Sequence, residues 1–63
     1  MSLKELRLSS GVLQEEVAKK LNVTQSAVSY WESGKTKPCR KYHAKLAKLY
    51  GCTVDDVRQA LDN

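Results

Sequence analysis

The segment Gln14–Lys37, QEEVAKKLNVTQSAVSYWESGKTK, is predicted to form two short helices joined by a tight turn. Its first half carries apolar residues at the spacing of one helix face, namely Val17, Ala18 and Leu21. This periodicity predicts a helix over 14–21. The turn is predicted at Asn22, because asparagine tolerates a left-handed backbone better than most residues that carry a side chain.

Thr24 can cap and Gly34 can end a second helix, which is predicted over 25–33. One face of this helix carries Val28, Trp31 and Glu32, and the other carries Gln25, Ser26, Ser29, Tyr30 and Ser33. The second face is polar but nearly uncharged, whereas a solvated helix usually carries paired Lys and Glu. Amides, hydroxyls and phenols can bond to the edges of bases. Trp31 has an alternative interpretation as an aromatic recognition residue, but its place beside Val28 favours the core.

This order of residues resembles the Cro and phage-repressor (XRE-like) helix-turn-helix family of DNA-binding transcriptional regulators. The resemblance covers nearly the whole chain and rests on Leu3, Leu6, Arg7, Gln14, Ala18, Asn22, Val28, Glu32, Gly34, Leu46, Ala47, Gly51 and Asp55. It implies an all-α, compact five-helix bundle of the lambda-repressor-like type. It also implies that the 25–33 helix lies in the major groove of double-stranded DNA.

The same resemblance implies the residues that contact DNA. Positions that read bases or touch the backbone in the family are occupied here by Gln25, Ser26, Ser29 and Tyr30. Positions that contact phosphates are occupied by Gln14, Lys35, Lys37 and Arg40. For Gln14 the alternative interpretation is an ordinary helix-forming residue. The chain departs from the family at Leu13, where relatives carry Ser, Thr or Asn as an N-cap, so the start of this helix is predicted to be less firmly set.

Three further helices are predicted over 3–10, 40–50 and 54–61. Their limits follow from capping and terminating residues: Ser2 with Glu5, Gly11, Gly51, and Thr53 with Asp56. Pro38 either bounds the loop before the fourth helix or opens that helix. The fifth helix carries an apolar stripe of Val54, Val57 and Leu61, which is predicted to close the core. In the resembling family this end commonly contributes to a two-fold dimer contact, so the resemblance implies a homodimer on DNA.

Arg7 shares its helix face with two leucines, Leu3 and Leu6, and would therefore need a partner when buried. Glu32, which also faces inward, is the candidate. In the resembling family an Arg and a Glu at these two positions form a buried ion pair. The alternative interpretation is two surface charges that never meet.

The charge of the chain is unevenly distributed. The formal net charge is +4 and the isoelectric point is near 9.3. The segment 35–48 contains no acidic residue but carries Lys35, Lys37, Arg40, Lys41, Lys45 and Lys48. This basic stripe is interpreted as a footprint for nucleic-acid phosphates, and the alternative is a solvated lysine-rich face.

The composition predicts a single domain spanning 1–63. A chain of 63 residues with 41% hydrophobic residues and no Phe suits a small helical bundle and leaves no room for a large catalytic cleft. No apolar run is long enough for a membrane span or a secretory signal, so a cytoplasmic location is expected. In that compartment the two cysteines, Cys39 and Cys52, are expected to be reduced.

No metal, cofactor or small-molecule ligand is predicted. Cys39 and His43 stand four residues apart, which is half of a metal site, but beyond Cys52 no further ligands are clustered. A single His and the lack of a glycine-rich phosphate loop argue against an enzyme. Two functions remain: a sequence-specific repressor or Cro-like regulator that binds an operator, or a protein-interaction module, such as an antirepressor or antitoxin partner, that has lost operator binding.

Overall fold

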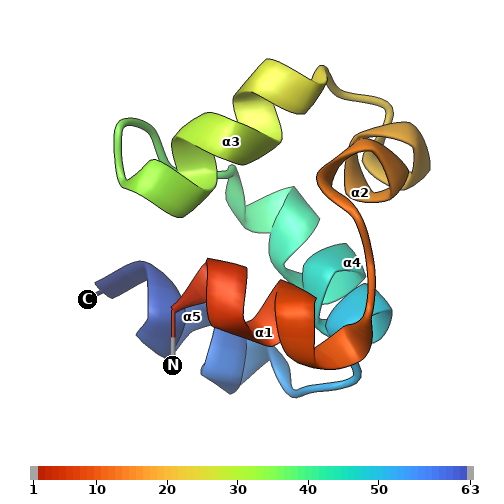
Figure 1. Cartoon of the computed structure of the whole chain (residues 1–63). Coiled ribbons are helices and arrows are strands. Elements are labelled where there is room, and N and C mark those ends of the chain that lie inside the picture. The colour runs from red at the N-terminus through yellow and green to blue at the C-terminus, as the bar shows by residue number, and fades with distance from the viewer. Residues whose placement is uncertain (1, 63) are drawn as a thin grey trace.

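Five α-helices follow one another through residues 2–62, the part of the chain that the computed structural model describes (Figure 1). They are α1 (Leu3–Ser10), α2 (Gln14–Leu21), α3 (Gln25–Ser33), α4 (Arg40–Tyr50) and α5 (Val54–Asp62). The predicted all-α bundle is confirmed, and the first four predicted ranges agree with the structure. The fifth helix, predicted over about 54–61, ends one residue later at Asp62, a difference within the usual variation of helix ends.

The turn between α2 and α3 is fixed by two residues. Asn22 adopts a left-handed backbone with φ of 58°, and its N–H donates to the carbonyl oxygens of Ala18 and Lys19 at the end of α2. Two residues later the Thr24 hydroxyl accepts a hydrogen bond from the Ala27 N–H at 3.1 Å. One helix therefore stops and the next begins within three residues, which sets the angle between α2 and α3.

The start of α2 lacks a side-chain cap, as predicted from Leu13, which has no acceptor atom. Only the reciprocal half of a capping box is present, because the Glu16 carboxylate accepts from the Leu13 N–H at 3.2 Å. The helix nevertheless begins at Gln14, where it was predicted to begin. Its first free N–H groups are left to solvent or to an anion.

The core lies where all five helices meet. Its buried apolar residues are Leu3, Leu6, Val17, Ala18, Leu21, Val28, Trp31, Leu46, Ala47, Tyr50, Val57 and Ala60. α4 contacts α1, α2 and α5, and its Leu46 is fully buried. Trp31 belongs to the core, as predicted, and its ring centroid lies 5.5 Å from that of Tyr42. Burial of Val28 and Trp31 in this core, with α3 packed against α2 and α1, therefore holds α3 with its other face outward.

The apolar stripe of α5 is mostly used inside the molecule. Val57 is fully buried and Leu61 is half-buried against the core, whereas Val54 remains 41% exposed. The stripe closes the core as predicted, and of its three residues Val54 is the one with substantial exposed surface. Within residues 2–62 no helix combines the length and the apolar character needed to cross a membrane.

Candidate nucleic-acid interface

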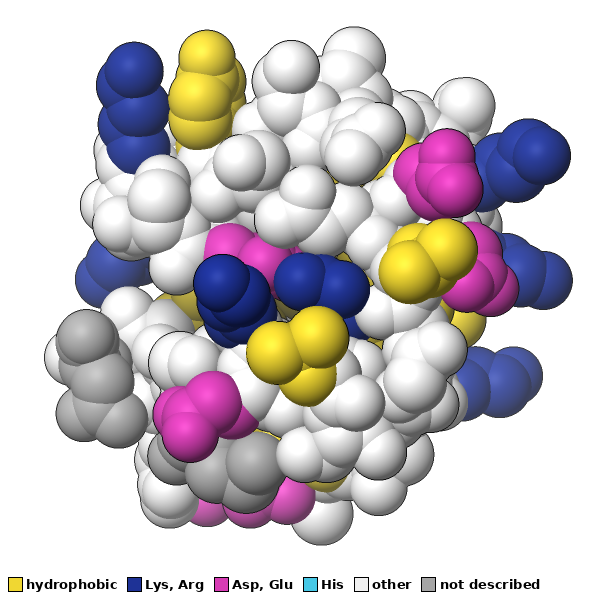
Figure 2. Space-filling model, in the orientation of Figure 1, with side chains coloured by type: hydrophobic (Ala, Val, Ile, Leu, Met, Phe, Trp, Pro, Cys, Tyr) yellow, Lys and Arg dark blue, Asp and Glu magenta, His cyan; other side chains and the backbone are white. Residues whose placement is uncertain are grey.

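The outward face of α3 is polar and accessible. All four residues predicted to contact bases are exposed: Gln25, Ser26, Ser29 and Tyr30. Figure 2 shows that the surface over α3 is almost entirely uncharged, apart from one basic side chain at its left end. Such a surface can donate and accept hydrogen bonds without a dominating charge, which suits contacts that depend on base identity.

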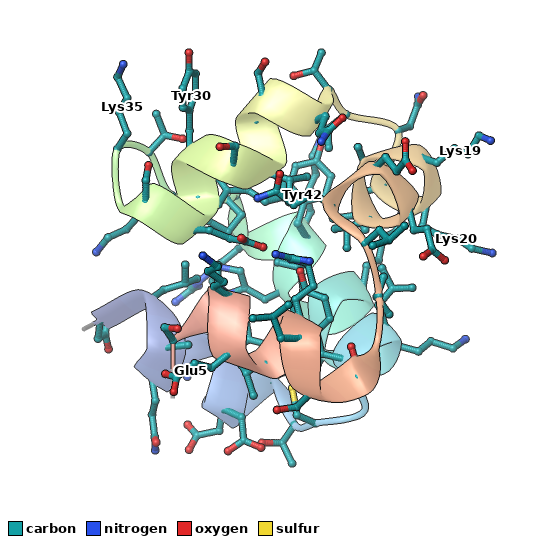
Figure 3. The ribbon with its side chains drawn as sticks, viewed as in Figure 1. Glu5, Lys19, Lys20, Tyr30, Lys35 and Tyr42 are labelled. Carbon is teal, nitrogen blue, oxygen red and sulfur yellow. The ribbon has the colours of Figure 1, made fainter. Side chains whose placement is uncertain are left out.

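Tyr30 is paired with a lysine from the following loop. The Lys35 ammonium nitrogen lies 4.8 Å from the centroid of the Tyr30 ring, and Figure 3 shows both side chains pointing away from the body of the molecule. The backbone supports this pairing, because the Lys35 N–H donates to the Tyr30 carbonyl oxygen at 3.0 Å. The sequence analysis missed the contact. The signal for it was the helix end at Gly34, whose φ of 82° turns the chain back over the last turn of α3.

The loop between α3 and α4 places basic side chains next to the polar face. Lys35, Lys37 and Arg40 are all exposed on this loop and on the first residue of α4. Pro38 is buried and precedes α4 by two residues, so it bounds the loop and does not open the helix. Of the predicted phosphate-contacting residues, Lys35 lies over Tyr30 and Lys37 lies with Ser33 and Gly34 at the end of α3.

Arg7 and Glu32 form an ion pair between α1 and α3. Arg7 Nε donates to Glu32 Oε2 at 2.5 Å and Arg7 Nη2 to Oε1 at 3.2 Å, with the two side chains only 8% and 6% exposed. Arg7 Nη1 also donates to the Val12 carbonyl oxygen at 3.0 Å. The hydrogen bonds to Glu32 raise the pKa of Arg7. Burial, followed by the negative charge of Glu32, raises the pKa of nearby Tyr50 to about 12.

Gln14 is half-buried and joins this pair. Its Nε2 donates to Glu32 Oε1 at 2.9 Å, so one amide hydrogen is held inside the molecule. The amide carries a second N–H group, and the N-terminus of α2 has no side-chain cap. The sequence predicted a phosphate contact for Gln14 but not its bond to Glu32, for which only Arg7 was expected as a partner.

The basic stripe of the sequence is divided in three dimensions. Lys35 and Lys37 lie at the end of α3, whereas Lys45 and Lys48 line a groove between α2 and α4 together with Lys20. Interpreting 35–48 as one continuous footprint was therefore too broad. The reason is helical geometry: α4 turns by about 100° per residue, so basic residues that are close in sequence reach different sides.

The half metal site does not assemble further. Within residues 2–62 no group of three His, Cys, Asp or Glu side chains is placed to hold a metal ion. Burial raises the pKa of the Cys52 thiol, which keeps it protonated and a poor ligand. His43 is partly buried, and its Nε2 has no hydrogen-bond partner among the described residues.

Comparison with known proteins gives a consistent family. A family model described as helix-turn-helix matches residues 3–57. The chain is 34% identical over 55 residues to the HTH-type transcriptional activator BcrR of Enterococcus faecalis, covering 87% of this chain and 27% of that protein. It is 36% identical to the uncharacterized HTH-type transcriptional regulator MJ0272 of Methanocaldococcus jannaschii, covering 87% and 83%.

A third relative is an uncharacterized HTH-type transcriptional regulator of Archaeoglobus fulgidus, 31% identical over 55 residues and covering 87% of this chain and 79% of that protein. No solved structure matches significantly. The relatives carry the names of transcriptional regulators, a class whose members are typically not enzymes. The five helices, the α2–α3 turn and these matches together show that the chain belongs to the Cro and phage-repressor (XRE-like) helix-turn-helix family of DNA-binding transcriptional regulators.

Proposed function

We propose that the protein binds an operator in double-stranded DNA sequence-specifically, with α3 in the major groove. The observation that carries this proposal is the exposed, uncharged polar face of Gln25, Ser26, Ser29 and Tyr30, bordered at one end by basic residues. Base edges in the major groove present a distinct pattern of donors and acceptors for each base pair, and such a face can read that pattern. Operator binding also implies a cytoplasmic location, where the chromosome lies.

The phosphate contacts are assigned to the two ends of this face. Lys35, Lys37 and Arg40 supply positive charge at the end of α3, and Gln14 with the α2 N-terminus supplies hydrogen-bond donors near its start. Contacts at both ends would fix the orientation of α3 in the groove. Occupation of an operator that overlaps a promoter would exclude the polymerase, and on that basis we propose a repressor or Cro-like regulator.

A salt titration of DNA binding tests this assignment. Lys37→Ala should weaken binding to a selected operator and to random duplex alike, because a phosphate contact carries no sequence information. It should also lower the slope of log affinity against log salt by about one counterion per monomer. Gel-shift titrations over a range of salt concentrations measure both quantities.

Lys48→Ala is the matched control, because it removes the same charge from the α2–α4 groove. It should leave the salt slope close to that of the unmodified protein. If the unmodified protein showed no preference for any selected duplex over random duplex, operator binding would be excluded. The protein would then be a protein-interaction module, such as an antirepressor or antitoxin partner.

A second expectation is that two copies bind one pseudo-palindromic site as a homodimer. One α3 presents only a few side chains, too few to specify a long site, and two recognition helices about 34 Å apart would read two half-sites in successive turns of the duplex. Val54, which is 41% exposed on α5, offers an apolar contact for the second copy. Sedimentation of the protein with operator duplex should give two protein chains per duplex. A saturating one-to-one complex on every tight site would rule the dimer out.

A further inference from the structure

A groove between α2 and α4 combines three lysines with two leucines. It is lined by Lys20, Leu21, Lys45, Lys48 and Leu49. Leu21 is buried and Leu49 is half-buried, so they form the floor, while the three lysines are exposed along the sides. No residue that lines the groove is acidic. Its surface is therefore apolar at the base and positively charged at the edges.

None of the three lysines of this groove forms an ion pair among residues 2–62. Among residues 2–62 the structure holds one ion pair, Arg7–Glu32, and it lies on other helices. Three ammonium groups around one groove repel one another and raise the local positive potential. An acidic partner would remove this repulsion as it bound.

The groove also lies away from the proposed DNA contact. Figure 3 shows Lys20 projecting from α2 on the opposite side of the view from Tyr30 and Lys35. Figure 2 shows basic side chains projecting from the same edge, with acidic side chains next to them. DNA bound along α3 would thus leave the positive charges of Lys20, Lys45 and Lys48 without a counter-ion.

We propose that this groove, defined by Lys20, Leu21, Lys45, Lys48 and Leu49, docks an acidic amphipathic segment of another protein. The leucine floor would accept apolar side chains of that segment, and the lysines would pair with carboxylates on either side of them. Charge complementarity alone would also admit nucleic acid. The leucines favour a peptide, because a phosphate backbone offers no apolar group to cover them.

The competing explanation is that the lysine stems merely cover the two leucines, with their ammonium groups in water. In that case the groove would have no preference for an apolar and acidic ligand over a neutral one. Binding experiments with the intact chain separate the two explanations, because they vary the ligand and the groove independently.

The probe is a synthetic helical peptide of about 15 residues with leucines on one face and glutamates beside them. Titrated into isotope-labelled protein, it should shift the backbone NMR signals of Lys20, Leu21, Lys45, Lys48 and Leu49. The affinity should fall as salt is added. A peptide with glutamine at every glutamate position should bind more weakly. Equal affinity of the two peptides, or shifts confined to α3, would overturn the proposal.

A charge reversal tests the groove itself. Lys48→Glu should lower the peptide affinity about fivefold, because an attraction is replaced by a repulsion at an exposed site. Lys4→Glu is the matched control: it makes the same change of net charge at an exposed position on α1, outside the groove, and should lower the affinity less than about twofold. Both residues are exposed, so both variants should fold. Equal losses in the two variants would show that the peptide responds only to net charge, which contradicts a specific site.

Two further measurements identify a different occupant. If random duplex DNA, and not the acidic peptide, shifted the groove signals, the groove would be a phosphate-binding surface and the proposal would be wrong. If the same signals shifted when the protein was concentrated alone, the occupant would be a second copy of the chain. Preserved operator preference in Lys48→Glu, together with the loss of peptide binding, would support two separate surfaces.

Discussion

Arg7→Ala is expected to lower the free energy of unfolding by about 3–5 kcal/mol. The arginine makes two hydrogen bonds to Glu32 and one to the Val12 carbonyl oxygen, and both charged side chains are almost wholly buried. Removing it would leave the Glu32 carboxylate buried with only the Gln14 amide as a partner. A buried carboxylate without its counter-ion is costly, and this cost exceeds the net contribution of the intact pair.

Thermal unfolding measures this loss. In a chain of this size each kcal/mol lowers the melting temperature by about 4–8 °C, so a decrease of well over 10 °C is expected. Lys19→Ala is the control, because Lys19 is exposed and its removal should change stability by less than about 0.5 kcal/mol. Equal melting temperatures for the two variants would contradict a stabilising role of the buried pair.

A double variant separates two effects: the loss of the ion pair, and the cost of leaving the Glu32 carboxylate buried without a counter-ion. Total stabilities of about 3–9 kcal/mol are typical for this chain length, so Arg7→Ala alone could unfold the protein. Combining Arg7→Met with Glu32→Leu removes both charges and keeps apolar volume. It should recover most of the stability lost in Arg7→Ala. Stability as low in the double variant as in the single one would mean that the pair itself, and not the unpaired carboxylate, dominates.

Gln25→Ala is expected to cost roughly 1–3 kcal/mol of affinity on the preferred operator and little on random duplex. Gln25 is the first residue of α3 and is exposed, next to the Thr24 cap that fixes the start of the helix. Its amide can donate and accept together, which suits adenine in the major groove. Without this contact, the affinity should no longer depend on which base pair occupies one position in each half-site.

The measurement is a set of binding titrations on operator, on operators with single substitutions, and on random duplex. Gln59→Ala is the matched control: it removes the same side chain from an exposed site on α5, where the amide donates only to Asp55. That variant should bind operator like the unmodified protein. If Gln25→Ala weakened operator and random duplex by the same factor, Gln25 would be a backbone contact and the base-reading assignment would fail.

The helices and their limits were determined by the sequence itself. Each limit depends on groups within one or two turns of the helix end. The Thr24 hydroxyl accepts a hydrogen bond from the Ala27 N–H at the start of α3, and Asn22 adopts a left-handed backbone at the end of α2. Such local hydrogen bonds and backbone preferences need no distant partner. Helical periodicity likewise placed Trp31 in the core and turned Arg7 and Glu32 inward.

Apart from the Arg7–Glu32 pair, tertiary structure decided which side chains of different helices meet. It brought the Gln14 amide to Glu32, and it separated Lys45 and Lys48 from the basic residues beside α3 to join Lys20. It also used most of the α5 stripe inside the core, leaving Val54 outside. Periodicity assigns a residue to a face of its own helix, but the neighbour of that face depends on how loops and close packing orient the helices against one another.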